Sequence, residues 1–124
     1  MSPFEELGGE PKLRAIVDDF IDRCFDDVMI GFLFARADRD RIKRFEYQHA
    51  AKALGAQIEY EGRPLDDAHR PHRILGGQFD RRKQILKETL HDHAVSKGVV
   101  EAWISHQDRL RHLITRDPDS NCQD

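Results

Sequence analysis

Seven histidines are the residues of this chain with the widest scope for metal chemistry. His91 and His93 stand two residues apart, so on one helix they would point to different sides and make a poor ligand pair. His69 and His72 have the i, i+3 spacing of one helix face, but no Cys, Asp or Glu pattern completes a zinc site around them. His106 lies in a polar-rich segment near the C-terminus, where we expect a surface histidine. The spacing therefore gives little support to zinc chemistry.

His69 stands apart because of the segment that carries it. This segment, from Ala56 to Gly76, is a long irregular connection, and such loops inside a compact helical domain are often functional. Pro64 can open one helical turn, which Pro71 then ends because proline disfavours helix at the residue before it. His69 would project from that single turn, where one neutral imidazole can hold haem iron while the porphyrin fills an apolar slot. A structural or solvent-exposed histidine is the alternative at such a position.

The elements that must position this turn are helices. Four segments carry apolar residues at helical spacing, and strand patterns are weak throughout. The second segment places Ile42, Phe45, His49 and Ala53 on one face. We therefore expect one all-α domain over residues 1–116, followed by a polar tail, residues 117–124. The four segments run from Pro11 to about Cys24, from near Asp38 to about Gly55, from about Gly77 to Ser96, and from Val99 to Ile114.

Charge and composition exclude several classes of partner. The net charge of −3 predicts no general attraction to nucleic acid or to an anionic membrane. Basic residues gather at 36–44 and 81–83, where nearby acids favour solvated helix faces. No apolar stretch has the length of a signal peptide core or of a membrane span. Two cysteines without metal-type spacing fit a reducing compartment, so we expect a soluble, cytoplasmic protein.

Two longer stretches carry a resemblance to a known family. Residues 7–20, LGGEPKLRAIVDDF, join a Gly-Gly pair to an amphipathic helix that ends in Phe. Residues 51–69, AKALGAQIEYEGRPLDDAH, contain Ala-Leu-Gly, Tyr-x-Gly and a histidine. The chain resembles the truncated haemoglobins, most closely their first group, from Phe4 to about Thr115, without a gap from Phe20 to Phe79. The resemblance implies an all-α truncated globin fold, a two-over-two sandwich of helices around haem.

The resemblance also implies a set of haem contacts. His69 matches the proximal ligand of the iron in iron protoporphyrin IX, and His72 is its rival. Tyr60 matches a tyrosine that hydrogen-bonds a haem propionate, and Lys43 and Arg44 lie near enough to offer a cation, unless they are ordinary surface charges. The other implied contacts are Phe34, Ile42, Phe45, Glu46, Leu65, Ile74 and Phe79.

The side of the haem that would bind ligand departs from the family. Ile21 stands where the family usually carries an oxygen-binding tyrosine, and Glu46 matches the common distal glutamine. Arg82 stands where an apolar residue is common. Bound O2 is partly negative and is held by hydrogen-bond donors, which isoleucine and an ionised glutamate are not. We therefore expect O2 to leave quickly unless Glu46 or another donor replaces the tyrosine.

Three states of this site remain open from the sequence. Burial among apolar side chains would favour a neutral Glu46, which could donate a hydrogen bond to the ligand. Glu46 could instead turn outward and pair with Arg44 or Lys43 at the surface. His49 or the neighbouring Tyr47 could ligate the iron directly when no gas is bound, and His49 is favoured because it shares the apolar face with Ile42. A histidine in the core or at the propionate edge is the alternative for His49.

These residues point to three functions, of which the first is our prediction. The chain would be a haem protein that binds O2, CO or NO, for oxygen binding or transport, with a six-coordinate or redox role. A globin-fold interaction or sensor module with weak or no haem binding is the alternative. Haem-dependent nitric-oxide or peroxide chemistry would make the chain an enzyme, and it would need a separate reductase as partner because the sequence contains no reductase domain.

Overall fold

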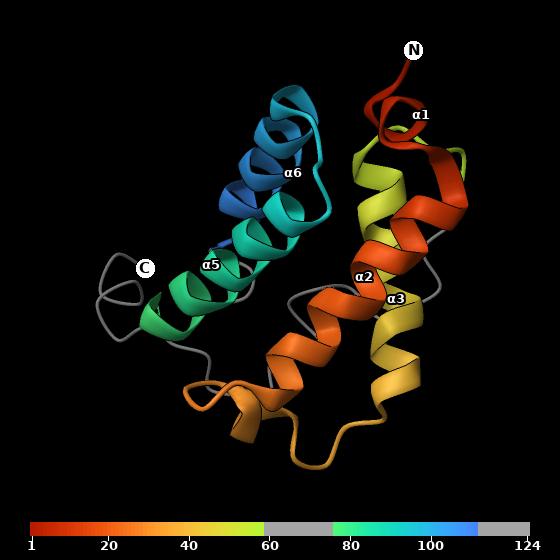
Figure 1. The fold of residues 1–124 in the computed structure, drawn as a ribbon. Helices are drawn as coiled ribbons and strands as arrows, with labels where there is room; N and C mark the ends of the chain where they lie inside the picture. Colours follow the sequence, from red (N-terminus) through yellow and green to blue (C-terminus); the bar gives the residue numbers. More distant parts are fainter. Residues whose placement is uncertain (59–75, 112–124) are drawn as a thin grey trace, which may run out of the picture.

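The computed structural model describes residues 1–58 and 76–111. Within these two ranges every regular element is a helix and no strand occurs (Figure 1). The predicted all-α class is therefore confirmed. The helices are α1 (Pro3–Leu7), α2 (Gly9–Asp26), the short 3₁₀ helix η1 (Gly31–Phe34), α3 (Arg39–Ala53), α5 (Gly76–Asp92) and α6 (Lys97–Arg109).

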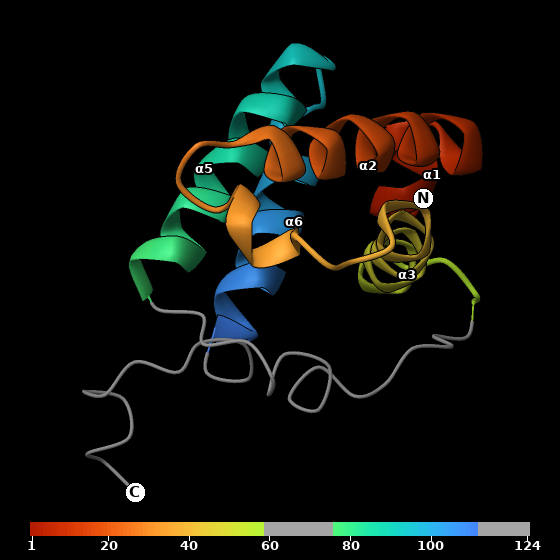
Figure 2. The ribbon, with the colours of Figure 1, turned by 90° about the horizontal axis from the view of Figure 1, so that it is seen from below.

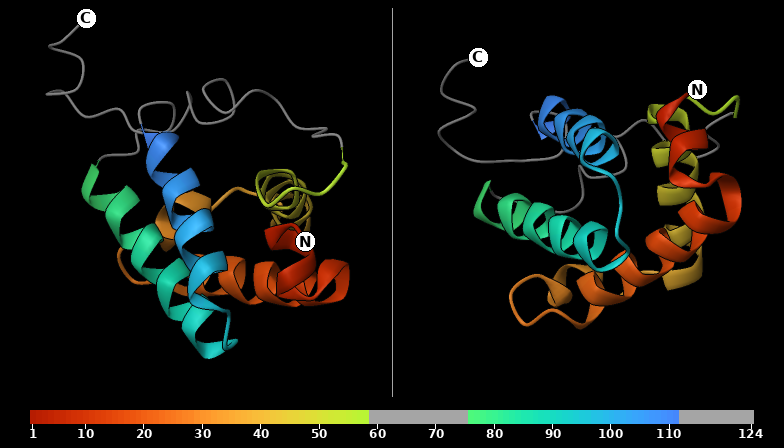
Figure 3. Two further views of the ribbon diagram at one scale, coloured as in Figure 1. Left: turned by 90° about the horizontal axis from the view of Figure 1, so that it is seen from above. Right: turned by 45° about the horizontal axis from the view of Figure 1, so that its top comes forward.

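The long helices form two pairs that pack against each other. Helix α2 packs on α3, and α5 runs beside α6 (Figure 2). Helix α2 also contacts α5, while α1 and α3 contact α6, so the pairs are joined at several points. The tilted view in Figure 3 separates the α5–α6 pair from the α2–α3 pair. This is the two-over-two arrangement that the resemblance to the truncated haemoglobins implies.

Helix α2 supplies the centre of the hydrophobic core. Its apolar side recurs every three to four residues, as an amphipathic helix requires, and all of its members are buried. Trp103 of α6 and Leu86 of α5 pack into the same cluster and are fully buried. Burial raises the pKa of the Cys24 thiol to about 12, so this cysteine behaves as a small apolar residue. The buried residues of α2 are Leu13, Ile16, Val17, Phe20, Ile21 and Cys24.

Side-chain caps begin two of the helices, α1 and α3. The Asp38 side chain accepts from the Arg41 backbone N–H, so α3 begins where the sequence predicted. The predicted extension of α5 to Ser96 is wrong, because α5 ends at Asp92. Ala94 adopts a left-handed conformation with φ 55°, which a continuing helix does not allow. The sequence patterns did not predict helix α1. Ser2 and Glu5 form a reciprocal capping box at its N-terminus.

Gly31 offers a test of how tightly the turn after α2 is packed. A Cβ at Gly31 would lie 2.6 Å from the carbonyl oxygen of Phe25, and a backbone atom cannot move aside alone. We expect Gly31→Ala to lower the free energy of unfolding by about 1–3 kcal/mol. Gly98→Ala is the matched control, because nothing lies within 4 Å of that site in α6 and alanine favours helix. Urea unfolding of both variants measures the difference, and equal midpoints would contradict the packing.

Candidate functional site

Helix α3 has two faces that differ in burial. One face, which includes Tyr47, Ala50 and Ala51, is buried in the core. The other is only half-buried and combines apolar with ionisable side chains. We call it the open face of α3, and it consists of Ile42, Phe45, Glu46 and His49 at the i, i+3, i+4, i+7 spacing of one helix side. A half-buried strip of this composition suits a flat, largely apolar group with polar edges.

Polar residues of three helices meet at the open face. The Arg82 guanidinium of α5 donates to the Glu46 carboxylate of α3 at 2.9 Å and to the amide oxygen of Gln107 on α6. The Arg82 and Glu46 side chains are only 19% and 13% exposed. The guanidinium also lies over the Phe20 ring of α2, 4.9 Å from its centroid. Arg82 is thus held inside the molecule by contacts with α2, α3 and α6.

Two imidazoles extend this group. The rings of His49 and His106 lie 5.1 Å apart between α3 and α6. Burial lowers the pKa of both rings, because desolvation disfavours the charged imidazolium. We call the five residues the interior polar cluster: Glu46, His49, Arg82, His106 and Gln107.

Two atoms of the interior polar cluster are buried without a hydrogen-bond partner among the described residues. They are Oε2 of Glu46 and Nε2 of His106. Buried polar atoms are normally satisfied, so such atoms mark a place where a bound group or water belongs. These two atoms and the half-buried apolar residues of α3 together suit a cofactor that has an apolar body and polar groups at its centre or edges.

Several expectations for these residues are wrong. The predicted surface pairing of Glu46 with Lys43 or Arg44 does not occur, since Glu46 pairs with Arg82. The Lys43 ammonium instead lies 2.6 Å and 2.9 Å from carboxylate oxygens of Asp18 and Asp22 on α2. The expectation of a buried Glu46 with only apolar neighbours fails as well, because a guanidinium accompanies it.

His106 and Arg82 were both assigned to the surface by their sequence context, and both assignments are wrong. His106 is half-buried, because the side of α6 that carries it faces α3. The neighbours of Arg82 are also partly buried and pair with carboxylates of other segments, Arg81 with Asp27 and Lys83 with Asp108. A signal for Arg82 was present, since it shares helical spacing with two buried residues of α5, Phe79 and Leu86.

The remaining predicted contacts fall into two groups. Phe34 stacks on Phe25, with ring centroids 4.7 Å apart, and is half-buried at the end of η1. Phe79 is buried on α5, with the Arg111 guanidinium 5.2 Å from its ring centroid. The other predicted residues lie outside the described ranges, and their roles stay predictions: Tyr60, Leu65, His69, His72 and Ile74.

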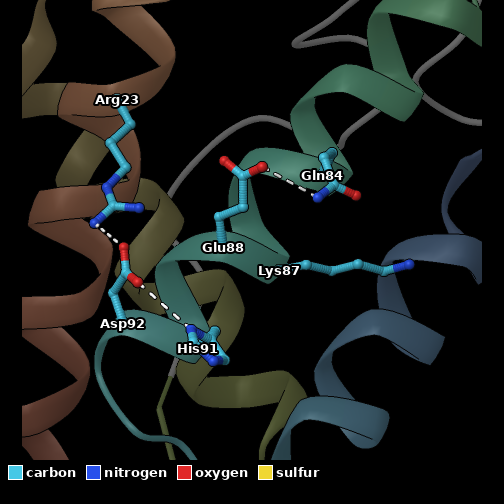
Figure 4. A pocket seen from close by; sticks show the side chains of 6 residues that line it. All are labelled: Arg23, Gln84, Lys87, Glu88, His91 and Asp92. Atoms are coloured by element: carbon cyan, nitrogen blue, oxygen red, sulfur yellow. Dashed lines mark hydrogen bonds and ion pairs between the residues drawn. The ribbon is translucent and has the colours of Figure 1, made fainter.

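A cavity of about 470 Å³ lies elsewhere, on the surface between α2 and α5 (Figure 4). Its lining is polar and largely charged: Arg23 binds Asp92 at 2.8 Å, and Gln84 donates to Glu88 at 3.1 Å. Such a charged lining does not suit an apolar cofactor. Across residues 1–58 and 76–111, no three His, Cys, Asp or Glu side chains gather to hold a metal ion. No helix in these ranges has the length and apolar character needed to cross a membrane.

Comparisons with known proteins identify the family. The sequence profile of the bacterial-like globins matches residues 2–116. The group 1 truncated hemoglobin GlbN of Synechocystis sp. is 28% identical over 101 residues, covering 78% of this chain and 82% of that protein. The group 1 truncated hemoglobin of Tetrahymena pyriformis is 26% identical over 97 residues, covering 78% of this chain and 80% of that protein.

Solved structures show the same fold. The Fe(III) form of the truncated hemoglobin from Tetrahymena pyriformis superposes with a TM-score of 0.87 at 23% identity, covering 93% of this chain and 98% of that chain. The group II truncated hemoglobin of Bacillus anthracis superposes with a TM-score of 0.84 at 21% identity, covering 94% and 92%. The chain belongs to the bacterial-like globin family, and its relatives include the group 1 truncated haemoglobins.

Proposed function

We propose that this globin binds one haem, iron protoporphyrin IX, with His69 as the proximal iron ligand, and that a diatomic gas binds on the opposite side of the iron. The observation that carries the proposal is the family match over residues 2–116, because membership of the globins implies haem binding. The fold agrees, since the two helix pairs have the arrangement of truncated haemoglobins. O2, CO and NO are the ligands proposed.

The chain offers residues suited to each part of the group. Ile42 and Phe45 of the open face provide apolar contact, and Oε2 of Glu46 lies buried beside them. When bound, haem supplies an iron atom that coordinates small ligands. Tyr60 is proposed to hydrogen-bond a propionate. Further apolar contacts are proposed for Phe34, Leu65, Ile74 and Phe79.

His49 is the proposed occupant of the sixth iron position when no gas is bound. Its pKa is lowered by burial, so the imidazole is neutral near neutral pH and retains a lone pair. It also belongs to the open face of α3, with Ile42 and Phe45. Oxygen transport and an electron-donating reductase stay predictions, since they depend on partners.

Carbon monoxide provides the test of the proposed function. We expect the full chain, loaded with haemin and reduced with dithionite, to form a CO complex with a sharp Soret band in its absorption spectrum. CO depends less on a hydrogen-bond donor than O2 does, so the missing tyrosine at Ile21 should not prevent binding. A chain that gives only the spectrum of free haem with CO would support the alternative function, a globin-fold module without haem.

A further inference from the structure

We infer that Arg82 is the ligand-binding donor of this globin, so that its haem site binds small inorganic anions with the help of a guanidinium on α5. The inference rests on the proposed function. It assigns to Arg82 the role of hydrogen-bond donor to the bound ligand. Ile21 cannot fill this role, because it is buried in α2 and its side chain carries no hydrogen-bond donor.

The position of Arg82 is fixed by three contacts from three helices. Glu46 and Gln107 accept hydrogen bonds from its two terminal nitrogens, and its Cζ lies over the Phe20 ring, 4.9 Å from the centroid. A long side chain held in this way has lost most of its rotamer freedom before any ligand arrives. The donor is therefore preorganised rather than recruited from solvent.

The Arg82 guanidinium has N–H groups that take no part in the bonds to Glu46 and Gln107. It carries five N–H groups in a rigid fork, and the bonds to Glu46 and Gln107 engage one on each terminal nitrogen. Glu46 also keeps one carboxylate oxygen, Oε2, buried and without a partner among the described residues. Glu46 belongs to the open face of α3, where the haem is proposed, so the Arg82 guanidinium that binds it lies at this face.

Charge determines which ligands this arrangement favours. Arginine stays charged at every physiological pH, and hydrogen bonds from a charged donor are about twice as strong as neutral ones. Because Glu46 cancels much of the long-range attraction, an anion would be held chiefly by direct hydrogen bonds from Arg82. Removing the carboxylate charge should therefore strengthen anion binding, and removing the guanidinium should weaken it.

Fluoride is the probe, because it is a one-atom anion whose binding to ferric haem is followed by absorption. We expect Arg82→Met to weaken fluoride binding to the haemin-loaded full chain by about tenfold to a hundredfold, the value of a charge-assisted hydrogen bond. Arg81→Met is the matched control, because Arg81 is adjacent but donates to Asp27 instead. Its fluoride affinity should equal that of the wild type.

Glu46→Gln provides a second variant with the opposite expected sign. It keeps the size of the side chain but leaves the Arg82 charge uncompensated, so fluoride should bind more tightly. If Arg82→Met fails to retain haem, this variant decides: tighter binding supports the inference, and unchanged affinity overturns it.

Haemin uptake and fluoride affinity separate a failure of the proposed haem binding from a failure of the role inferred for Arg82. A wild-type chain that takes up no haemin removes the proposed function and the inference with it. A normal haem spectrum with equal fluoride affinity in wild type and Arg82→Met overturns the inference alone.

Discussion

His69→Ala is expected to abolish stable haem binding, whereas His72→Ala should retain it. His69 is proposed as the only protein bond to the iron on the proximal side, and apolar contacts alone would hold the porphyrin loosely. The two histidines are three residues apart in the same segment, so each variant controls for the other. The measurement is the ratio of haem to chain after gel filtration of protein loaded with one equivalent of haemin.

The opposite pattern would reassign the ligand. If His72→Ala loses haem and His69→Ala keeps it, the iron is held by His72. Equal haem content in both variants would exclude both residues as the sole proximal ligand, and His49 of α3 would then become the residue to replace.

Trp103→Ala is expected to cost about 3–5 kcal/mol of the free energy of unfolding. Trp103 is fully buried and is the largest side chain in the core, where it joins α6 to the α2 and α5 residues of the same cluster. A loss of that size is a large part of the total stability of a domain of this length. Urea unfolding followed by circular dichroism measures it.

Trp103→Phe is the matched control for the volume of the side chain. The indole Nε1 is buried without a hydrogen-bond partner among the described residues, so phenylalanine loses volume but no hydrogen bond. We expect a smaller cost, about 1–2 kcal/mol. A Phe variant as unstable as the Ala variant would show that the indole N–H makes a bond important for stability.

Local chemistry was enough to predict most of the helices, while their two-over-two arrangement came from the family resemblance. The Asp38 cap predicted the start of α3, and helical spacing placed Ile42, Phe45 and His49 on one face, which the structure shows to be half-buried. The end of α5 was not predictable in this way. The chain turns at Ala94, a non-glycine residue in a left-handed conformation, and sequence offers no special signal for that.

The interior polar cluster was less predictable, for a physical reason. Glu46 and Arg82 are 36 residues apart in the sequence, and their pairing depends on how α3 faces α5. Charge patterns within a single helix carry no information about such a partner. A run of basic residues favours a solvated face, but Arg81 and Lys83 are also partly buried and pair with Asp27 and Asp108. At Arg82 the tertiary contact prevails over the local pattern.

An absorption titration of the haem-free full chain with haemin tests the central claim most directly. We predict a narrow Soret band that grows linearly and stops at one haemin per chain, because the proposed function gives the chain a single haem site. A gradual rise without a break, with the broad spectrum of free haemin, would contradict the claim that this globin holds haem.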